Sequence, residues 1–184
     1  MKEFNLLIEK LKNDVQKGAS EENLKKVVNR IAGFYVDKMQ LNSDEVAIFL
    51  SNQEKNILSF AYPEYLINSG MIPVSSTDAV AAHVFRTGRS IMENNFQQQK
   101  HLFIFELIKT PDNKIKPIWK VMSSIIATPD EKIGVIQTSR RGTDISEVGG
   151  DFTLQDLDFL EKTINDLAPL IKLVLPENFR GKIR

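Results

Sequence analysis

Apolar residues recur every three or four positions through the first forty residues, which is the spacing of one face of an α-helix. Gly18 separates two such stretches, and Ser20 after it can cap the second with its hydroxyl group. The pattern therefore predicts helices over residues 4–17 and 20–40.

The pattern changes after residue 45 to short β-branched and aromatic runs, which favour strands. Two pairs of these runs are joined by turn-forming residues, so each pair is predicted to form an antiparallel hairpin. Between the pairs a short helix is expected, with the hydroxyl and carboxylate groups of Ser75-Ser76-Thr77-Asp78 as its caps and Gly88 at its end. The expected strands cover residues 46–50, 57–62, 71–74, 90–93, 118–127 and 132–139, and the expected later helices cover residues 78–87, 97–109 and 153–175.

This order of elements favours an α/β (α+β) fold, in which an antiparallel sheet has its helices packed mainly on one side. A chain of 184 residues with 42% apolar and 26% charged residues is typical of one globular domain. We expect residues 1–42 to form N-terminal helices that dimerise, residues 43–175 to form the main domain, and residues 176–184 to be a tail.

The charge balance argues against binding to large polyanions. Lys and Arg number 24, as do Asp and Glu, so no net field attracts nucleic acid or an anionic membrane. No apolar run approaches the roughly 20 residues needed to cross a bilayer, and the first segment does not resemble a signal peptide. The sequence thus predicts a cytoplasmic protein with no direct nucleic-acid partner and no membrane insertion.

The sequence lacks the residues that several kinds of catalytic and metal sites require. With no cysteine, the chain has no thiolate nucleophile, no disulfide and no sulfur ligand for a metal or chromophore. Only His83 and His101 could supply imidazole ligands, which excludes a centre of several histidines, and we expect no metal site. Neither a nucleophile elbow nor a phosphate-binding Gly-rich loop is present. A non-enzymatic role is therefore expected.

Four segments together resemble the GAF domain family. They are residues 79–92, which include Thr87-Gly88-Arg89, residues 122–129, residues 133–137 with the triplet Ile133-Gly134-Val135, and residues 151–160, which begin Asp151-Phe152-Thr153. The four segments follow one another in the same order as in the family, and together they span roughly residues 44–172. The resemblance implies a profilin-like sheet of six antiparallel strands with helices behind it and a pocket in front, capped by residues 93–117. Domains of this family bind cyclic nucleotides, tetrapyrroles or other small effectors, or act as dimerising relays, so the ligand and any cofactor stay open.

The resemblance also bears on one ion pair. Cyclic-nucleotide-binding members carry an Asn-Lys-Phe-Asp-Glu signature, and here Arg140 and Arg141 replace its first two residues, while Phe152 and Asp156 are kept and Leu157 replaces the last. It implies an ion pair between Arg141 and Asp156. We interpret this pair as a structural clasp rather than as a nucleotide site.

A cluster of aromatic and small polar residues is the candidate ligand pocket, because pockets are mainly apolar with a few orienting polar groups. Phe103 and Phe105 are two residues apart, so one helix face cannot bury both. Ordinary core packing is the alternative interpretation, as it is for His83 and His101, which could otherwise serve a noncovalent tetrapyrrole. The predicted pocket residues are Asn94, Asn95, Phe96, Phe103, Phe105, Trp119, Ser123 and Ser124.

We therefore predict a non-catalytic sensor domain that binds a small-molecule effector and relays a signal through a homodimer. The alternative is a ligand-free dimerisation or signalling adaptor. The dimer is expected because the first helix cannot bury its apolar stripe without a partner surface, and the last helix carries a similar stripe. These stripes comprise Phe4, Leu7 and Leu11 in the first helix, and Leu157, Leu160, Ile164, Leu167, Ile171 and Val174 in the last.

Overall fold

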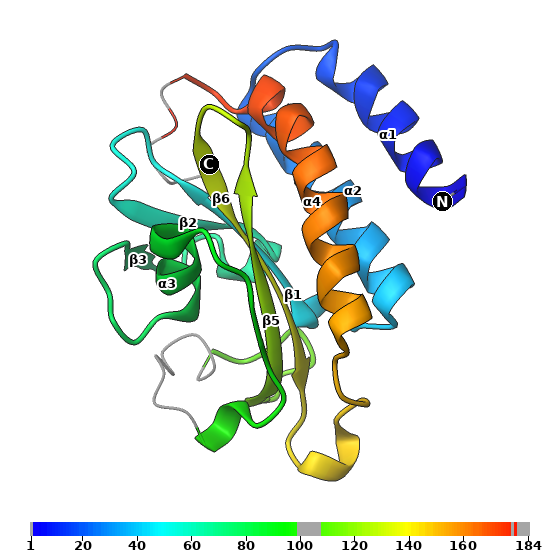
Figure 1. The fold of residues 1–184 in the computed structure, drawn as a ribbon, viewed down its shortest axis with the longest axis vertical. Coiled ribbons are helices and arrows are strands. Elements are labelled where there is room, and N and C mark those ends of the chain that lie inside the picture. The colour runs from blue at the N-terminus through cyan, green and yellow to red at the C-terminus, as the bar shows by residue number, and fades with distance from the viewer. Residues whose placement is uncertain (1, 99–107, 178, 180–184) are drawn as a thin grey trace.

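The computed structural model describes residues 2–98, 108–177 and 179, and within them six antiparallel strands form one sheet (Figure 1). The strands are β1 (Val46–Ser51), β2 (Ile57–Tyr62), β3 (Met71–Pro73), β4 (Ile91–Glu93), β5 (Ile118–Ala127) and β6 (Lys132–Arg141). Their order across the sheet is β3-β2-β1-β6-β5-β4, so β1 and β6 lie at its centre. The predicted six-stranded antiparallel sheet is confirmed.

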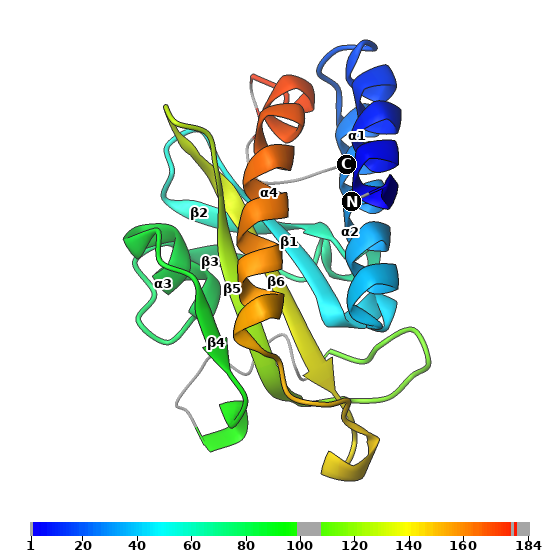
Figure 2. The same ribbon diagram turned by 45° about the vertical axis from the view of Figure 1, so that its right-hand side comes forward.

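Two long helices cover one face of the sheet, a third packs on the outside of these two, and a short helix lies on the other face (Figures 1 and 2). The helices are α1 (Lys2–Val15), α2 (Glu21–Met39), α3 (Val80–Thr87) and α4 (Leu154–Val174). On the first face α2 contacts β1 and β2, and α4 contacts β5, while α1 packs on α2 and α4. Opposite them, α3 contacts β5 and β6. In the part of the chain that the structure describes, no helix is long and apolar enough to cross a membrane.

Most element boundaries agree with the sequence prediction to within two residues. Ser20 caps α2 by accepting a hydrogen bond from the backbone N–H of Asn23 at 3.1 Å, and Gly88 ends α3 with a left-handed φ of 68°. The predicted capping of α3 by side chains of residues 75–78 is wrong, because Ala79 occupies the cap position and no side chain caps the helix. The helix expected over residues 97–109 lies largely outside the described residues.

The apolar stripe of α1 is buried within the chain itself. Phe4 and Leu7 are 8% and 7% exposed and Leu11 is completely buried, all in the same core as α2, α4 and the sheet. The rings of Phe4 and Phe34 are 5.5 Å apart between centroids. The α4 stripe from Leu160 to Val174 faces the same core. The premise that α1 needs a partner surface is therefore wrong, because α2 and α4 supply that surface.

A buried carboxylate joins the end of α1 to α2. Asp14 Oδ2 accepts a hydrogen bond from Arg30 Nε at 2.7 Å, and Asp14 Oδ1 lies 2.5 Å from Lys26 Nζ. Burial alone would raise the pKa of Asp14, but hydrogen bonds and charges from Lys26 and Arg30 together lower it below its ordinary value of 3.8. The ionised form is thus favoured in the folded state.

This shift predicts a pH-dependent contribution of Asp14 to stability. A carboxyl group with a lowered folded-state pKa stabilises the fold above its unfolded pKa, and this contribution is lost as the pH falls through the folded pKa. We expect Asp14→Asn to lower the free energy of unfolding at pH 7 and to lower it less at pH 3. Urea unfolding of both proteins at the two pH values measures this, and an equal loss at both would contradict it.

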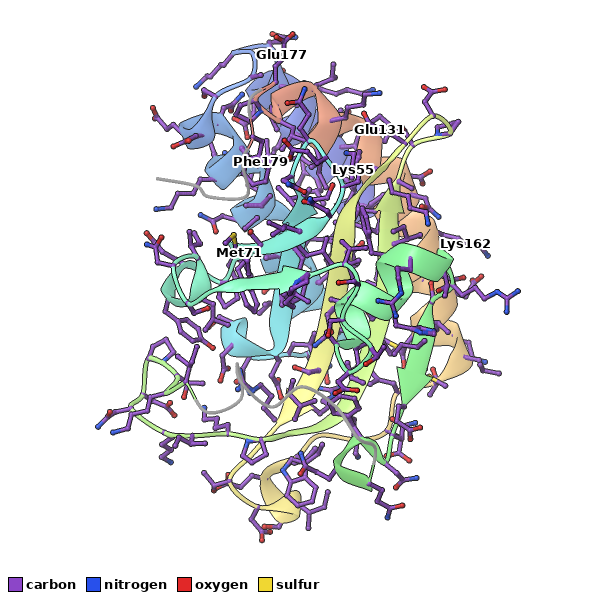
Figure 3. The ribbon with its side chains drawn as sticks, turned by 90° about the vertical axis from the view of Figure 1, so that its left-hand side faces the viewer. Lys55, Met71, Glu131, Lys162, Glu177 and Phe179 are labelled. Carbon is purple, nitrogen blue, oxygen red and sulfur yellow. The ribbon has the colours of Figure 1, made fainter. Side chains whose placement is uncertain are left out.

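One acidic side chain joins the β1–β2 turn, the β5–β6 turn and the last turn of α4 at the same end of the sheet. Glu131, in the turn between β5 and β6, forms two ion pairs. Its Oε2 lies 3.2 Å from Lys55 Nζ, and its Oε1 lies 3.0 Å from Lys172 Nζ. Figure 3 shows Lys55 and Glu131 near this end, with the view directed at the α3 face. Both hairpins and the last turn of α4 are thereby tied together.

Candidate ligand-binding cavity

A cavity of about 70 Å³ opens on the α3 face of the sheet, between β1, β2, β6 and the start of α3. Strand alternation forms its floor, because Ala47 and Phe49 of β1 point to the α3 face while Ile48 points to the core with α2 and α4. Its apolar wall comprises Val46, Ala47, Phe49, Phe60, Pro63, Leu66, Ile72, Ala79, Val80, Ala81, Phe96 and Ile118, and its polar side comprises Asp44, Gln137, Ser139 and Arg141.

An irregularity in the sheet shapes the apolar wall. The register between β1 and β2 shifts between Ile48 and Phe49, so that Phe49 pairs with Phe60. Their ring centroids are 4.4 Å apart with an interplanar angle of 42°, which is a favourable tilted contact. A shift of this kind re-aims side chains relative to a regular ladder. It places two aromatic rings together in the wall of the cavity.

The polar side is built by the last residues of β6. Gln137, Ser139 and Arg141 are spaced by two, so they share one face of the strand, and Ala47 of β1 is opposite Gln137. Ser139 Oγ donates to the carbonyl oxygen of Glu45 at 3.3 Å, and Arg141 N donates to Glu45 Oε1 at 2.6 Å. These bonds fix the end of β6 against the segment that precedes β1.

The guanidinium group of Arg141 is the main cation of the cavity. Its Nε donates to the Lys116 carbonyl oxygen at 2.9 Å, and its Nη1 donates to the Asp44 carbonyl oxygen at 3.2 Å and to Tyr65 Oη at 3.4 Å. Burial raises the pKa of Tyr65, opposed by the charge of Arg141, so its hydroxyl stays protonated at neutral pH. The carboxylate of Asp44 pairs with Lys116 Nζ at 3.5 Å.

Of the predicted pocket residues, Phe96 lines this cavity, and it is 5% exposed. Asn94 instead holds the chain before α4, because it accepts from Phe152 N at 2.9 Å and donates to Phe152 O at 3.0 Å. Asn95 is exposed, with its backbone N–H bonded to Glu93. Phe103 and Phe105, like His101, lie outside the described residues.

The three predicted residues of β5 are placed in the sheet rather than in the cavity lining. Trp119 Nε1 donates to the Gly142 carbonyl oxygen at 3.0 Å, and Ser123 Oγ donates to the Ile136 carbonyl oxygen at 3.3 Å. Ser124 Oγ is 3.1 Å from the hydroxyl of Ser90. Their polar groups therefore form hydrogen bonds with backbone carbonyl oxygens and with a neighbouring side chain.

Arg141 and Asp156 do not form the ion pair that the resemblance implied. Arg141 points to the cavity, whereas Asp156 accepts from Thr153 N at 2.8 Å in the cap of α4. Arg140 joins the loop to the helices instead: it donates to the Gln40 carbonyl oxygen at 2.8 Å and lies 5.2 Å from the centre of the Phe152 ring. Sequence alone could not choose between the two arginines without knowing where β6 alternates.

No cluster of three or more histidine and acidic side chains suited to a metal ion occurs in residues 2–98 and 108–177. His83 is exposed on α3 and is not among the residues of the cavity wall. Arg141, Gln137, Phe49 and Phe60 are cavity residues that the sequence analysis missed. For Gln137 and Arg141 the signal is the alternation of residues 137, 139 and 141 at the end of a strand, whereas the pairing of Phe49 with Phe60 has no local sequence signal.

Comparison with known proteins identifies the fold. No family model and no curated protein sequence matches the chain. The GAF domain of an Acinetobacter phosphoenolpyruvate-protein phosphotransferase has a TM-score of 0.63 and 10% identity over 92% of each chain. That of a Bacillus halodurans two-component sensor histidine kinase has a TM-score of 0.51 and 19% identity over 78% of this chain and 92% of that one.

An enzyme is also among the similar structures. A type II free methionine-R-sulfoxide reductase from Thermoplasma acidophilum has a TM-score of 0.57 and 13% identity over 84% of this chain and 97% of its own. The solved structures thus show that the chain has the GAF-domain fold, as its sequence motifs predicted. At these identities they show the fold and not the ligand.

Proposed function

We propose that this chain is a non-catalytic sensor domain that binds a small-molecule effector in the cavity on the α3 face. The observation that carries the proposal is the composition of that cavity, in which aromatic and aliphatic walls meet a few polar groups at one end. This combination is typical of ligand sites, where apolar surface supplies affinity and polar groups supply orientation.

The chemistry of the lining supports binding rather than catalysis. A guanidinium group carries hydrogen-bond donors and no acceptor, so Arg141 is suited to holding a ligand rather than to abstracting a proton. Asp44 pairs with Lys116, and no cysteine is present for a thiol mechanism. The histidine kinase and phosphotransferase neighbours carry their GAF domains beside other functions, which is compatible with a regulatory role in the cytoplasm.

The sheet offers a physical route from the cavity to the helices. Alternate residues of β1 and β6 contact the two sides, with Phe49 and Val135 in the α3-side cluster and Ile48 and Ile136 in the core with α2 and α4. A ligand that displaces these strands would shift the packing of the long helices, because close-packed cores transmit strain. The predicted homodimer is part of this proposal, because an interface between two copies of these helices would change when their packing changes.

Native mass spectrometry of the freshly purified protein tests the proposal. A mass excess that disappears on denaturation would reveal a co-purified effector. A clean protein without added mass, together with no thermal shift from any effector class, would contradict the sensor and favour the ligand-free adaptor.

Filling the cavity is expected to abolish effector binding. Ala47→Leu adds three carbon atoms to the cavity floor, whereas Ala127→Leu makes the same change in β5 outside the cavity lining. A ligand at a hundred times its Kd stabilises the fold by about 2.7 kcal/mol. This raises Tm by about 5 to 10 °C for a chain of this size. We expect that shift in the wild type and in Ala127→Leu but not in Ala47→Leu; a shift retained by Ala47→Leu would contradict the assignment of the site.

A further inference from the structure

Arg140 connects the centre of the sheet to the end of α2. Its backbone is in β6, where it pairs with Lys120 of β5. Its guanidinium group donates to the carbonyl oxygen of Gln40 at 2.8 Å from Nη1 and to that of Met39 at 3.2 Å from Nη2. The last carbonyl groups of a helix have no partner within the helix. Arg140 therefore caps the end of α2 with a side chain that comes from the sheet.

The same guanidinium group packs on the segment that leads into α4. It lies 5.2 Å from the centre of the Phe152 ring, which is within the range of a cation–π contact. A Cβ built on Gly149 would lie 3.0 Å from Nη1, so this loop also approaches the guanidinium closely. Phe152 is 3% exposed, and Asn94 binds both its N–H and its carbonyl oxygen. The ring is therefore a fixed surface for the guanidinium.

The residues on either side of Arg140 line the cavity. Ser139 and Arg141 point to the α3 face, whereas Arg140 points to the helices, because adjacent residues of a strand alternate between its two faces. In Figure 2 the end of β6, the last turn of α2 and the first turn of α4 lie at the same end of the molecule. A displacement of the end of β6 at the cavity would thus also move the base of the Arg140 side chain.

The bonds of Arg140 give such a displacement a direction. Apolar packing between the sheet and the helices is non-directional. Hydrogen bonds to two carbonyl groups have a preferred geometry, and the planar guanidinium presents its donors in a rigid fork. A shift of β6 therefore pulls or pushes the end of α2 through these bonds.

Resting on the proposed function, we propose that Arg140 couples the cavity to the two long helices on the other face of the sheet. Occupation of the cavity displaces the end of β6. Arg140 passes this displacement through its carbonyl bonds to the last turn of α2, and through the Phe152 ring to the first turn of α4. Arg140 is thus a positioning residue of the relay and does not contact the effector.

The test uses Ala47→Leu in place of the unidentified effector. This substitution adds carbon atoms to the cavity floor opposite Gln137 of β6, and overpacking displaces backbone. Hydrogen exchange of backbone amides reports local opening of the last turn of α2 and the first turn of α4. We expect Ala47→Leu to change exchange rates in both turns by at least about threefold in the otherwise wild-type chain, and by less than about 1.5-fold in the Arg140→Gln background. Each response is a ratio within one background, so the effect of Arg140→Gln on stability cancels.

Arg30→Gln provides the control background. Arg30 is also bound to α2, but its Nε donates to Asp14 at 2.7 Å, which joins α2 to α1 and not to β6. The response of both turns to Ala47→Leu should remain at least about threefold there. An equally reduced response would show that any loosening of α2 removes it, and would contradict a special role for Arg140.

Phe152→Leu separates the two routes and tests the proposal even where Arg140→Gln fails to fold. Leucine fills much of the buried space but offers no aromatic face to the guanidinium, whose bonds to α2 are kept. We expect the response of α2 to Ala47→Leu to persist in this background and that of α4 to fall below about 1.5-fold. Circular dichroism checks that each variant is folded.

Two further results would overturn the coupling role: equal responses in the wild-type and Arg140→Gln backgrounds, or no response of either turn to Ala47→Leu in any background. Both would leave the sensor proposal intact, because co-purified mass and effector-induced thermal shifts test it separately. Conversely, the absence of any effector would remove the sensor proposal, while the responses to Ala47→Leu would still measure the coupling.

Discussion

Replacing Gly134 with alanine is expected to destabilise the fold by about 3 kcal/mol or more, because the new Cβ would meet backbone that cannot move aside. Built on the structure, that Cβ overlaps the carbonyl oxygen of Phe49 and lies 3.1 Å from Leu50 Cα. Gly134 is in β6, paired with Leu50 of β1 and Ile126 of β5 at the centre of the sheet. Phe49 is also a wall of the cavity, so a displacement here would disturb the proposed site.

Gly33→Ala is the matched control for this substitution. Gly33 lies within α2, and a Cβ built there has no atom within 4 Å. Alanine is favoured over glycine in a helix by about 1 kcal/mol, so this variant should be more stable than the wild type. Chemical denaturation of the three proteins measures the opposite effects. A Gly134→Ala protein as stable as the wild type would show that β1 and β6 approach less closely than described.

Truncating Leu11 to alanine is expected to cost about 2 to 5 kcal/mol, the range found when a buried leucine loses its packing. Leu11 is completely buried in the core that α1 shares with α2 and α4. If the α1 stripe instead needed a second copy of the chain, the loss would depend on protein concentration. Because the chain itself covers Leu11, we expect the loss to be the same at low and high concentration.

Leu6→Ala provides the matched control for Leu11→Ala. Leu6 is in the same helix but is 50% exposed, so its truncation should change stability by no more than about 0.5 kcal/mol. Urea denaturation at two protein concentrations, with light scattering for the molar mass, compares both variants with the wild type. A concentration-dependent loss for Leu11→Ala would mean that α1 is covered by a partner after all.

Local sequence patterns predicted the elements of this fold well because each pattern reflects one repeat of the backbone. The helical spacing of α2 and α4 and the paired runs of β5 and β6 gave bounds close to those observed. The glycines also have local structural reasons, since Gly88 ends α3 with a positive φ and Gly134 lies against a neighbouring strand. The GAF-type motifs then placed these elements in a known fold.

The candidate site was predicted much less well, because it is assembled from residues far apart in the chain. Phe96 was expected in the pocket and lies there, but Asn94, Ser123 and Ser124 use their polar groups within the structure. The irregularity at Phe49, which brings its ring against Phe60, has no local sequence signal. Pairing between strands decides it.

Local patterns in the chain were enough to establish which elements form, that the chain has no thiol group, and that it carries GAF-type motifs. Tertiary contacts were needed to establish that α2 and α4 cover the apolar stripe of α1 and that Arg141, rather than Arg140, faces the cavity. The reason is that strand alternation gives adjacent residues opposite faces, so the start and register of β6 decide which arginine faces which side. Those features depend on contacts between distant segments, which local periodicity does not record.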